Sequence, residues 1–207
     1  MAGRFISLEG GEGVGKSTQL SRLAGALRAR GHDVVETREP GGSPGAEAIR
    51  ALLLEGEAER WSPQSEALLF AAARADHVAK LIRPALERGA WVLSDRFLDS
   101  SLAYQGGAGG VGAEAIRALH VIGSGGLLPD RTLLLQLPAE AAAARAMKRD
   151  GHAGDRIGAR GAGYHAQVAA AFEAMAEAEP DRFRIVDATG STDAVAGRIL
   201  VVLEDLL

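Results

Sequence analysis

Near its N-terminus the chain reads Phe5-Ile6-Ser7-Leu8-Glu9 and then Gly10-Gly11-Glu12-Gly13-Val14-Gly15-Lys16-Ser17-Thr18. The first run is mainly apolar, which favours a buried strand. The second fits the spacing G-x-x-x-x-G-K-[ST], in which glycines let successive backbone N–H groups converge on one anion. Apolar residues at helical spacing follow, so the anion would lie at a helix N-terminus with its partial positive charge.

This arrangement predicts that residues 10–18 bind the phosphates of a nucleoside triphosphate. Lys16 can reach the β- and γ-phosphates, and the Ser17 hydroxyl can ligate Mg²⁺. An ordinary glycine-rich turn is the alternative, since the chain contains 27 glycines. That alternative does not require a strand before the motif and a helix after it, whereas this sequence offers both.

Composition restricts the other possibilities. A chain of 207 residues with 47% hydrophobic and 24% charged residues predicts one globular domain, residues 1–207. A net charge of −4 argues against a general nucleic-acid binder. The absence of cysteine excludes disulfides and thiolate chemistry. No apolar run reaches membrane-spanning length and no signal peptide is recognised, so we expect a cytoplasmic protein without a membrane partner.

Strands and helices are expected to alternate along the chain. This order predicts an α/β fold with a parallel sheet and helices on both faces. The helix that starts at Ser62-Pro63 is expected to be irregular near Pro84. The expected strands are 5–8, 33–37, 91–94, 132–137 and 184–186, and the expected helices are 16–30, 46–54, 62–88, 112–122, 139–148, 164–178 and 191–206.

Polar residues follow four of the expected strands, at the edge where ligands bind in such sheets. These are the glycine-rich loop, Arg38-Glu39-Pro40, Asp95-Arg96 and Asp187-Ala188-Thr189. Asp95 ends an apolar strand, the position of an acid that holds Mg²⁺, and a turn-forming Asp is the alternative. Arg96 beside it could bind a phosphate through two hydrogen bonds, or could be a surface arginine.

A second group of residues could bind a nucleotide base. Phe70 and Arg74 are four residues apart and share a helix face, so an aromatic ring and a guanidinium could contact one base. Taken alone, Phe70 is more simply a core residue. Ser100, Ser101, Tyr104 and Gln105 offer hydroxyl and amide groups soon after Asp95-Arg96.

Taken together, these blocks resemble the bacterial thymidylate kinases, P-loop nucleoside monophosphate kinases that phosphorylate dTMP. The matching blocks cover nearly the whole chain in the family's order. They are Leu8-Glu9 with residues 10–18, Thr37-Arg38-Glu39-Pro40-Gly41-Gly42, residues 69–74 with His77, Ser94-Asp95-Arg96-Phe97, residues 100–106, and Asp155-Arg156-Ile157.

The resemblance implies a P-loop NTPase fold with a five-stranded parallel sheet and a short lid at about residues 148–161. It implies transfer of the ATP γ-phosphoryl group to dTMP, giving dTDP and ADP for dTTP synthesis, by a homodimer. Gly10 to Thr18 would bind ATP, and Ser17 and Asp95 would bind Mg²⁺. The Glu39–Pro40 peptide bond is expected to be cis.

The acceptor site is implied by the same resemblance. Glu12 would contact the sugar 3′-hydroxyl, Arg96 the acceptor phosphate, and Tyr104 the sugar, where it disfavours a ribose. Phe70 would stack on thymine with Arg74 at the base edge. Ser101 and Gln105 would lie near the base, and Glu39 in a loop over the acceptor.

The catalytic cations are expected to be Lys16, Arg96, Mg²⁺ and the lid. The loop carries no arginine beside Glu12, so the lid should supply the missing charge. Arg149 and Arg156 are the candidates, with Lys148 behind them, and Arg149 is preferred because Arg156 next to Asp155 is expected to form an ion pair. Gly158 departs from the family, which often has Glu at this position.

Three other functions fit parts of the pattern. Another P-loop monophosphate kinase, acting on adenylate, guanylate or cytidylate, is disfavoured by the Thr-Arg-Glu-Pro-Gly-Gly loop. A nucleotide switch or motor lacks support because no switch or partner-binding feature is recognised. A catalytically inactive binding module conflicts with intact Lys16, Asp95 and Arg96.

Overall fold

Five parallel strands form one sheet in the computed structural model, which describes residues 3–57, 59–150 and 155–207, apart from the side chains of 146, 149 and 150. The spatial order is β2-β3-β1-β4-β5, and every neighbouring pair is parallel. This confirms the predicted five-stranded parallel sheet. The strands are β1 (Arg4–Glu9), β2 (Val34–Arg38), β3 (Trp91–Asp95), β4 (Arg131–Gln136) and β5 (Phe183–Asp187).

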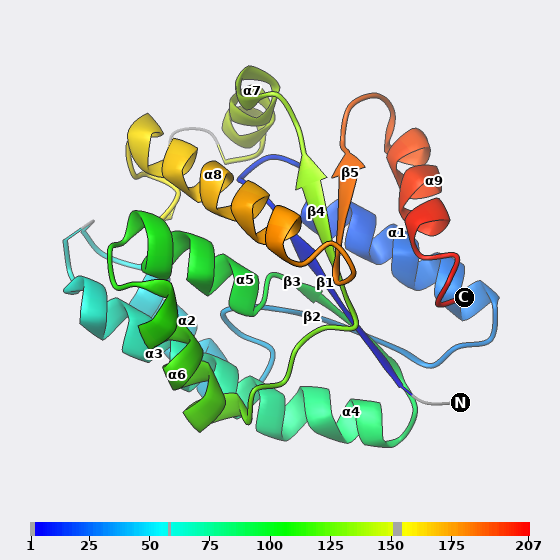
Figure 1. Ribbon diagram of the computed structural model, residues 1–207, viewed down its shortest axis with the longest axis horizontal. Helices are drawn as coiled ribbons and strands as arrows, with labels where there is room; N and C mark the ends of the chain where they lie inside the picture. Colours follow the sequence, from blue (N-terminus) through cyan, green and yellow to red (C-terminus); the bar gives the residue numbers. More distant parts are fainter. Residues whose placement is uncertain (1–2, 58, 151–154) are drawn as a thin grey trace.

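Helices cover both faces of the sheet (Figure 1). On one face lie α1 (Lys16–Ala29) and α9 (Thr192–Val202). The other face carries α3 (Pro63–His77), α4 (Arg83–Glu87), α5 (Leu98–Ser101), α6 (Ala113–Ser124) and α8 (Ala162–Ala178). Helix α2 (Pro44–Leu54) packs against α3, and α7 (Ala139–Asp150) follows β4. Within the described ranges, no helix combines the length and apolarity needed to cross a membrane.

The central strand shows why both faces need helices. Ile6 and Leu8 of β1 are fully buried against α1 and α9, whereas Phe5 packs on the opposite face. Ser7 and Glu9 lie on the same face as Phe5 and are also fully buried. A buried polar group needs a hydrogen-bond partner. Ser7 is hydrogen-bonded to Thr132, and Glu9 to Phe97 and Ser100 in the segment that follows β3.

The predicted helix 62–88 is one helical run with an irregular turn. Residues Val78–Ile82 form a π-helical turn, η1, between α3 and α4. Pro84 lies two residues after it, in the first turn of α4. Proline has no N–H group and its ring collides with the carbonyl four residues earlier, so the helix adopts a wider turn at this point.

Residues 98–108 differ from the sequence prediction, which assigned them no helix. They form α5 and a second π-helical segment, η2 (Leu102–Ala108). Gly106 and Gly107 disfavour a helix intrinsically. Tertiary packing stabilises the helical conformation of this segment, because η2 contacts both α6 and α8. The consequence is that Ser101, Tyr104 and Gln105 share one helical face.

The site lies beyond the carboxyl ends of β1 and β3. These strands are neighbours, with Leu8 opposite Asp95. After β1 the chain enters α1 on one face, and after β3 it enters α5 on the other, which opens a crevice between the two loops. Gly10 begins the first loop with φ 131°, and a Cβ there would lie 2.5 Å from the Leu135 carbonyl oxygen. Only glycine fits this close approach.

Candidate active site

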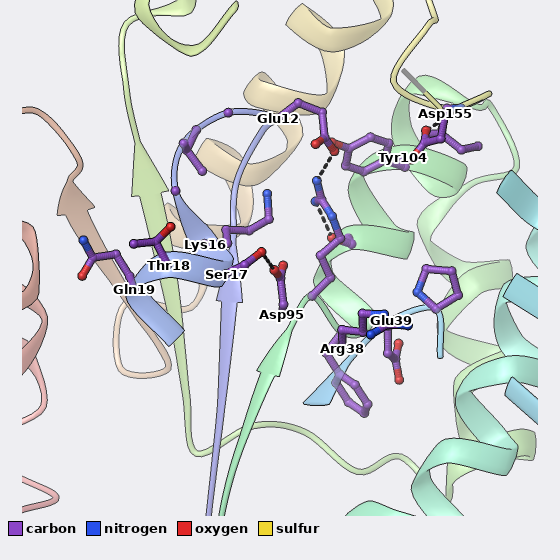
Figure 2. A pocket seen from close by; sticks show the side chains of 18 of the residues that line it. Glu12, Lys16, Ser17, Thr18, Gln19, Arg38, Glu39, Asp95, Tyr104 and Asp155 are labelled. Carbon is purple, nitrogen blue, oxygen red and sulfur yellow. Dashed lines mark hydrogen bonds and ion pairs between the residues drawn. The ribbon is translucent and has the colours of Figure 1, made fainter. Parts of the chain in front are cut away.

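Lys16 lies at the centre of the glycine-rich loop, at the start of α1 (Figure 2). Its Nζ donates hydrogen bonds to the carbonyl oxygens of Gly10 (3.2 Å) and Gly11 (2.7 Å). The side chain is buried. Burial, and then the positive charge of Arg96, lower the pKa of Lys16 to about 8. A phosphate placed in the loop would restore its preference for the protonated form.

Ser17 and Asp95 meet beside Lys16, as Figure 2 shows. The Ser17 hydroxyl donates a hydrogen bond of 2.5 Å to Asp95 Oδ2, although the residues are 78 positions apart. A hydroxyl and one carboxylate are a typical partial ligand set for Mg²⁺, which keeps waters and substrate phosphates as its other ligands. The two predicted metal ligands are therefore brought together.

Arg96 is held against the loop by several acceptors. Its Nη2 donates to Glu12 Oε1 (2.5 Å), and its Nη1 donates to the Gly10 carbonyl (3.0 Å) and Ser100 Oγ (3.1 Å). The guanidinium also lies over the Tyr104 ring, 5.1 Å from its centroid. Glu12, Arg96 and Tyr104, which were predicted to surround the acceptor sugar and phosphate, thus form one group.

The Tyr104 hydroxyl is buried and makes no hydrogen bond of good geometry among the described residues, although the Arg96 guanidinium lies beside it. Burial raises the pKa of Tyr104, so the phenol keeps its proton. A buried hydroxyl without a partner is rare in folded proteins. It is therefore a candidate to contact a bound ligand.

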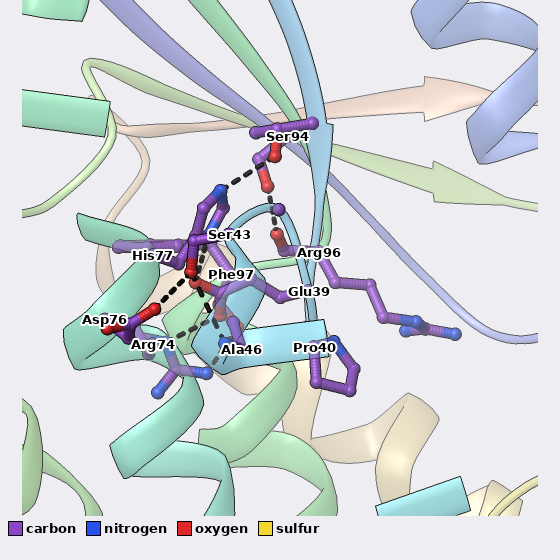
Figure 3. A network of polar contacts seen from close by, with 12 residues as sticks. Glu39, Pro40, Ser43, Ala46, Arg74, Asp76, His77, Ser94, Arg96 and Phe97 are labelled. Atoms are coloured by element: carbon purple, nitrogen blue, oxygen red, sulfur yellow. Dashed lines mark hydrogen bonds and ion pairs between the residues drawn. The ribbon is translucent and has the colours of Figure 1, made fainter. Parts of the chain in front are cut away.

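Arg74 is almost completely buried at the opposite end of the crevice (Figure 3). Its Nε donates to Glu39 Oε2 (2.7 Å), and its Nη2 donates to Ser101 Oγ (2.7 Å) and the Phe97 carbonyl (3.3 Å). Glu39 also contacts His77 Nδ1 at 3.1 Å. Glu39, predicted in a loop over the acceptor, lines the cavity, and its carboxylate orients the Arg74 guanidinium. The Glu39–Pro40 peptide bond is cis, as expected.

Gly42 shows how tightly this end is packed. Its φ is 87°, and a Cβ there would lie 2.4 Å from both His77 Nε2 and Thr37 Oγ1. Those two atoms are themselves hydrogen-bonded at 2.7 Å. Gly42, the second glycine of the Thr-Arg-Glu-Pro-Gly-Gly block, is thus required because His77 and Thr37 leave no room for a side chain.

Phe70 is half-buried and faces the crevice rather than lying wholly in the core. Gln105 lies nearby, and its Nε2 donates a hydrogen bond of 3.0 Å to Glu66 Oε1. Because the amide nitrogen bonds the carboxylate, the orientation of the Gln105 amide is determined by Glu66.

Most of the predicted site residues line one continuous cavity of about 1020 Å³. This volume is at the upper limit of ordinary ligand pockets and suits two substrates. Beyond the loop, the cavity continues to the end of β5 and the start of α9. The predicted site residues that line it are Glu12, Gly13, Val14, Gly15, Lys16, Ser17, Thr18, Glu39, Phe70, Arg74, Asp95, Arg96, Ser101, Tyr104 and Gln105.

The end of β5 lines the cavity with backbone and small side chains, and not with the carboxylate of Asp187. Ala188, Gly190 and Ser191 line the cavity. Asp187 accepts hydrogen bonds from the backbone N–H and the hydroxyl of Thr189, both at 2.9 Å, and so stabilises the turn. The loop after β5 therefore lies at the cavity, as expected from the sequence. The Asp187 carboxylate stabilises that loop.

The predicted lid is described only in part. Arg149 lies at the end of α7 with its side chain outside the described residues, and residues 151–154 are also outside them. Asp155 and Ile157 line the cavity. Arg156 is fully buried: its Nη2 donates to Glu66 Oε2 (2.6 Å) and its Nε to the Leu53 carbonyl (2.9 Å). Arg156 forms an ion pair, as expected, and Glu66 on α3 is a partner in it.

The sequence reasoning missed several residues at or near the cavity, and four of them are charged. Arg50 and Arg145 line the cavity from α2 and α7, and Arg160 pairs with Glu66 at 2.6 Å. Glu9 lies beneath the loop that carries Arg96. Arg50 follows the buried Ala46 by four residues, so its place on the inner face of a helix was a signal that could have found it.

Comparisons with known proteins agree with one another. The family model described as thymidylate kinase matches residues 8–199. A thymidylate kinase of Rhizorhabdus wittichii is 63% identical over 207 residues, covering 100% of both chains. One of Caulobacter vibrioides is 54% identical over 197 residues, covering 95% of this chain and 94% of the relative. The crystal structure of a thymidylate kinase from Ehrlichia chaffeensis matches with a TM-score of 0.78 and 29% identity, covering 98% of this chain and 100% of that chain.

Proposed function

The chain belongs to the thymidylate kinase family and transfers the γ-phosphoryl group of ATP to dTMP, giving dTDP and ADP; we propose here how its residues divide this work. The observation that carries the proposal is the arrangement of Lys16 and Arg96. Two cations, from neighbouring strand ends, face one cavity large enough for both nucleotides.

At the donor end, we propose that residues 10–18 surround the ATP phosphates. Lys16 would exchange its two carbonyl contacts for the β- and γ-phosphate oxygens. The far end of the cavity, between Arg145 and the start of α9, would receive the nucleoside of ATP. Its small side chains, Ala188, Gly190 and Ser191, leave room for a flat base.

Ser17 and Asp95 would hold Mg²⁺. Their oxygens already lie within hydrogen-bonding distance, so an ion with oxygen ligands fits between them and the phosphates. Mg²⁺ bound there would supply positive charge to the phosphates of ATP. The remaining charge stabilisation comes from the protein's own cations.

At the acceptor end, Arg96 would bind the dTMP phosphate. Glu12 accepts a hydrogen bond from the guanidinium and would also contact the sugar 3′-hydroxyl. Tyr104, under the guanidinium, would lie against the sugar and disfavour a ribose. Phe70 would stack on thymine, with Arg74, Ser101 and Gln105 along its edge. Glu39 would act through Arg74, because its carboxylate is used on that side chain.

The acceptor oxygen belongs to a phosphate that is largely ionised near neutral pH. No side chain has to remove a proton from it. Catalysis then consists of aligning two anions and compensating the charge that develops on the transferring group. Lys16 and Arg96 both donate to the Gly10 carbonyl, so the two positive charges would lie close together beside this group and reduce the repulsion between the two nucleotides.

The lid would supply one further cation, and we propose Arg149. The other candidate, Arg156, is fully buried on Glu66 and would have to break that ion pair to reach a phosphate. An interaction made only in the transition state lowers kcat with little change in KM. Arg149→Ala should therefore reduce kcat at saturating ATP and dTMP, and a full kcat in this variant would contradict the assignment.

We also propose a homodimer. Three large apolar side chains on the packed helices α3 and α6 are exposed, Leu68 (55%), Val121 (61%) and Ile122 (83%). Apolar surface of this kind is typical of interfaces. Light scattering of the wild type and of Ile122→Glu tests this, and a monomeric wild type would contradict it.

The cytoplasmic location stays a prediction.

Acceptor choice can be tested with one assay. ADP release is measured with dTMP, dUMP, AMP, GMP and CMP as acceptors, and Lys16→Ala serves as the inactive control. The proposed base site predicts that dTMP is phosphorylated far more efficiently than AMP, GMP and CMP. Equal or higher kcat/KM with one of these three would contradict it.

A further inference from the structure

The backbone of Arg96 is held in an unfavourable conformation. Its φ is 71°, and among the described residues it is the one non-glycine residue with a positive φ. Side chains other than glycine rarely adopt this region. Such a conformation persists only where the surrounding structure determines it. The question is which contacts do so.

Three hydrogen bonds fix the peptide groups around Arg96. Its N–H donates to the Leu8 carbonyl (3.0 Å), and the Ser94 hydroxyl donates to the Arg96 carbonyl (2.7 Å; Figure 3). The other side of this same peptide group is held by a side chain, because the Phe97 N–H donates to Glu9 Oε1 at 2.8 Å. Glu9 is fully buried, so no water competes for this contact.

Glu9 also reaches the guanidinium through one intermediate. The Ser100 hydroxyl donates to Glu9 Oε2 at 2.6 Å, and Arg96 Nη1 donates to the same hydroxyl oxygen at 3.1 Å. A hydroxyl can serve both contacts because it has one proton and two lone pairs. The Glu9 carboxyl group thus makes two contacts. One oxygen binds the Phe97 N–H, and the other binds the Ser100 hydroxyl, which in turn contacts the Arg96 guanidinium.

We infer that Glu9 is a positioning residue for acceptor binding, which holds both the backbone and the guanidinium of Arg96 in the orientation that receives the dTMP phosphate. The inference rests on the proposed role of Arg96. Glu9 itself would not touch either nucleotide. Its removal should therefore weaken dTMP binding while ATP binding, which depends on Lys16, is retained.

The test compares dissociation constants for dTMP and for ATP with Mg²⁺, each measured by titration calorimetry on the intact chain. Glu9→Ala should weaken dTMP binding about 10-fold or more, the scale of effect expected when a strained site loses its support, and change ATP binding less than about 3-fold. Glu9→Gln can accept from Phe97 and donate to Ser100, so it should bind dTMP almost as the wild type does. Ser7→Ala is the matched control: Ser7 is equally buried on the same face of β1, but its hydroxyl contacts Thr132.

A double-variant cycle separates the inference from the proposed function. If Glu9 acts through Arg96, then Glu9→Ala combined with Arg96→Ala binds dTMP no more weakly than Arg96→Ala alone. Additive losses would overturn the inference, as would an equal loss of ATP and dTMP binding in Glu9→Ala. Wild-type dTMP binding by Arg96→Ala itself would instead overturn the proposed role of Arg96, and the inference with it.

Glu9→Asp covers the case in which Glu9→Ala does not fold. Its carboxylate is one methylene shorter and cannot reach both Phe97 and Ser100 without moving them. The inference predicts a selective loss of dTMP binding in this variant. Unchanged dTMP binding would overturn it.

Discussion

Arg156 and Glu66 form a buried ion pair between the lid and α3. Arg156 Nη2 lies 2.6 Å from Glu66 Oε2, and the two side chains are 0% and 3% exposed. Arg160 reaches the same oxygen at 2.6 Å, and Gln105 donates to the other oxygen of Glu66. The C-terminal part of the lid is therefore connected to a residue that lines the cavity.

This relationship predicts a stability effect for Arg156. Arg156→Ala should lower the free energy of unfolding by about 3 kcal/mol, because it removes one partner of a buried ion pair. Urea unfolding measures this. Arg198→Ala is the control, since its pairing with Asp187 is exposed and 3.5 Å long, and its loss should cost less than about 1 kcal/mol. Equal effects of the two substitutions would contradict the prediction.

A second prediction concerns Lys16. Lys16→Ala should reduce the rate of ADP formation by about 10²- to 10³-fold or more, because it removes a preorganised charge from the transferring phosphoryl group. The fold should be retained, as judged by circular dichroism. Arg22→Ala, an exposed cation on the same helix, should keep the wild-type rate. A Lys16→Ala rate near that of the wild type would refute the phosphate-loop assignment.

A third prediction concerns Phe70. Base–aromatic stacking contributes about 1–3 kcal/mol in comparable nucleic-acid sites, so Phe70→Ala should weaken dTMP binding by roughly 5- to 150-fold. The KM for ATP should stay nearly constant. Leu52→Ala, which changes an exposed apolar residue of α2, is the control. If Phe70→Ala unfolds instead, Phe70 is primarily a core residue.

A fourth prediction concerns the pH dependence of stability. Burial, followed by the negative charge of Asp99, raises the pKa of Glu9 to about 8 from 4.5. Between these values the folded chain keeps a proton that the unfolded chain has released. The contribution of Glu9 to stability therefore decreases as pH rises from 4.5 to 8. Glu9→Gln cannot ionise, so it should gain stability relative to the wild type across this window, by at most about 1.4 kcal/mol per pH unit.

Urea unfolding of both chains between pH 5 and 9 measures this difference. Glu179→Gln is a control without pH dependence in this range, because a hydrogen bond from Arg182 lowers the pKa of Glu179 below 4.5. Its carboxyl is ionised in both the folded and the unfolded chain above pH 5, so the stability difference between this variant and the wild type should stay constant from pH 5 to 9. A difference between Glu9→Gln and the wild type that does not vary with pH would mean that Glu9 is ionised throughout.

Local patterns in the sequence were sufficient for the donor end of the site. The strand, the glycine turn and the helix that form it lie within residues 4–29, so spacing alone predicts which atoms converge. The pairing of Ser17 with Asp95 also followed, because the carboxyl ends of parallel strands meet at one edge of the sheet. The family resemblance then identified Phe70, Arg74, Arg96 and Tyr104 as lining residues.

The tertiary structure alone decided how those residues are supported. Glu9 meets Phe97 only because β3 is the neighbour of β1, and Glu66 meets Arg156 only because α3 packs beside the lid. The helical form of residues 98–108 likewise depends on packing against α6 and α8 and opposes their glycine content. Such contacts join residues about 90 positions apart, and no local spacing encodes them, since they depend on strand order and on which buried polar groups find partners.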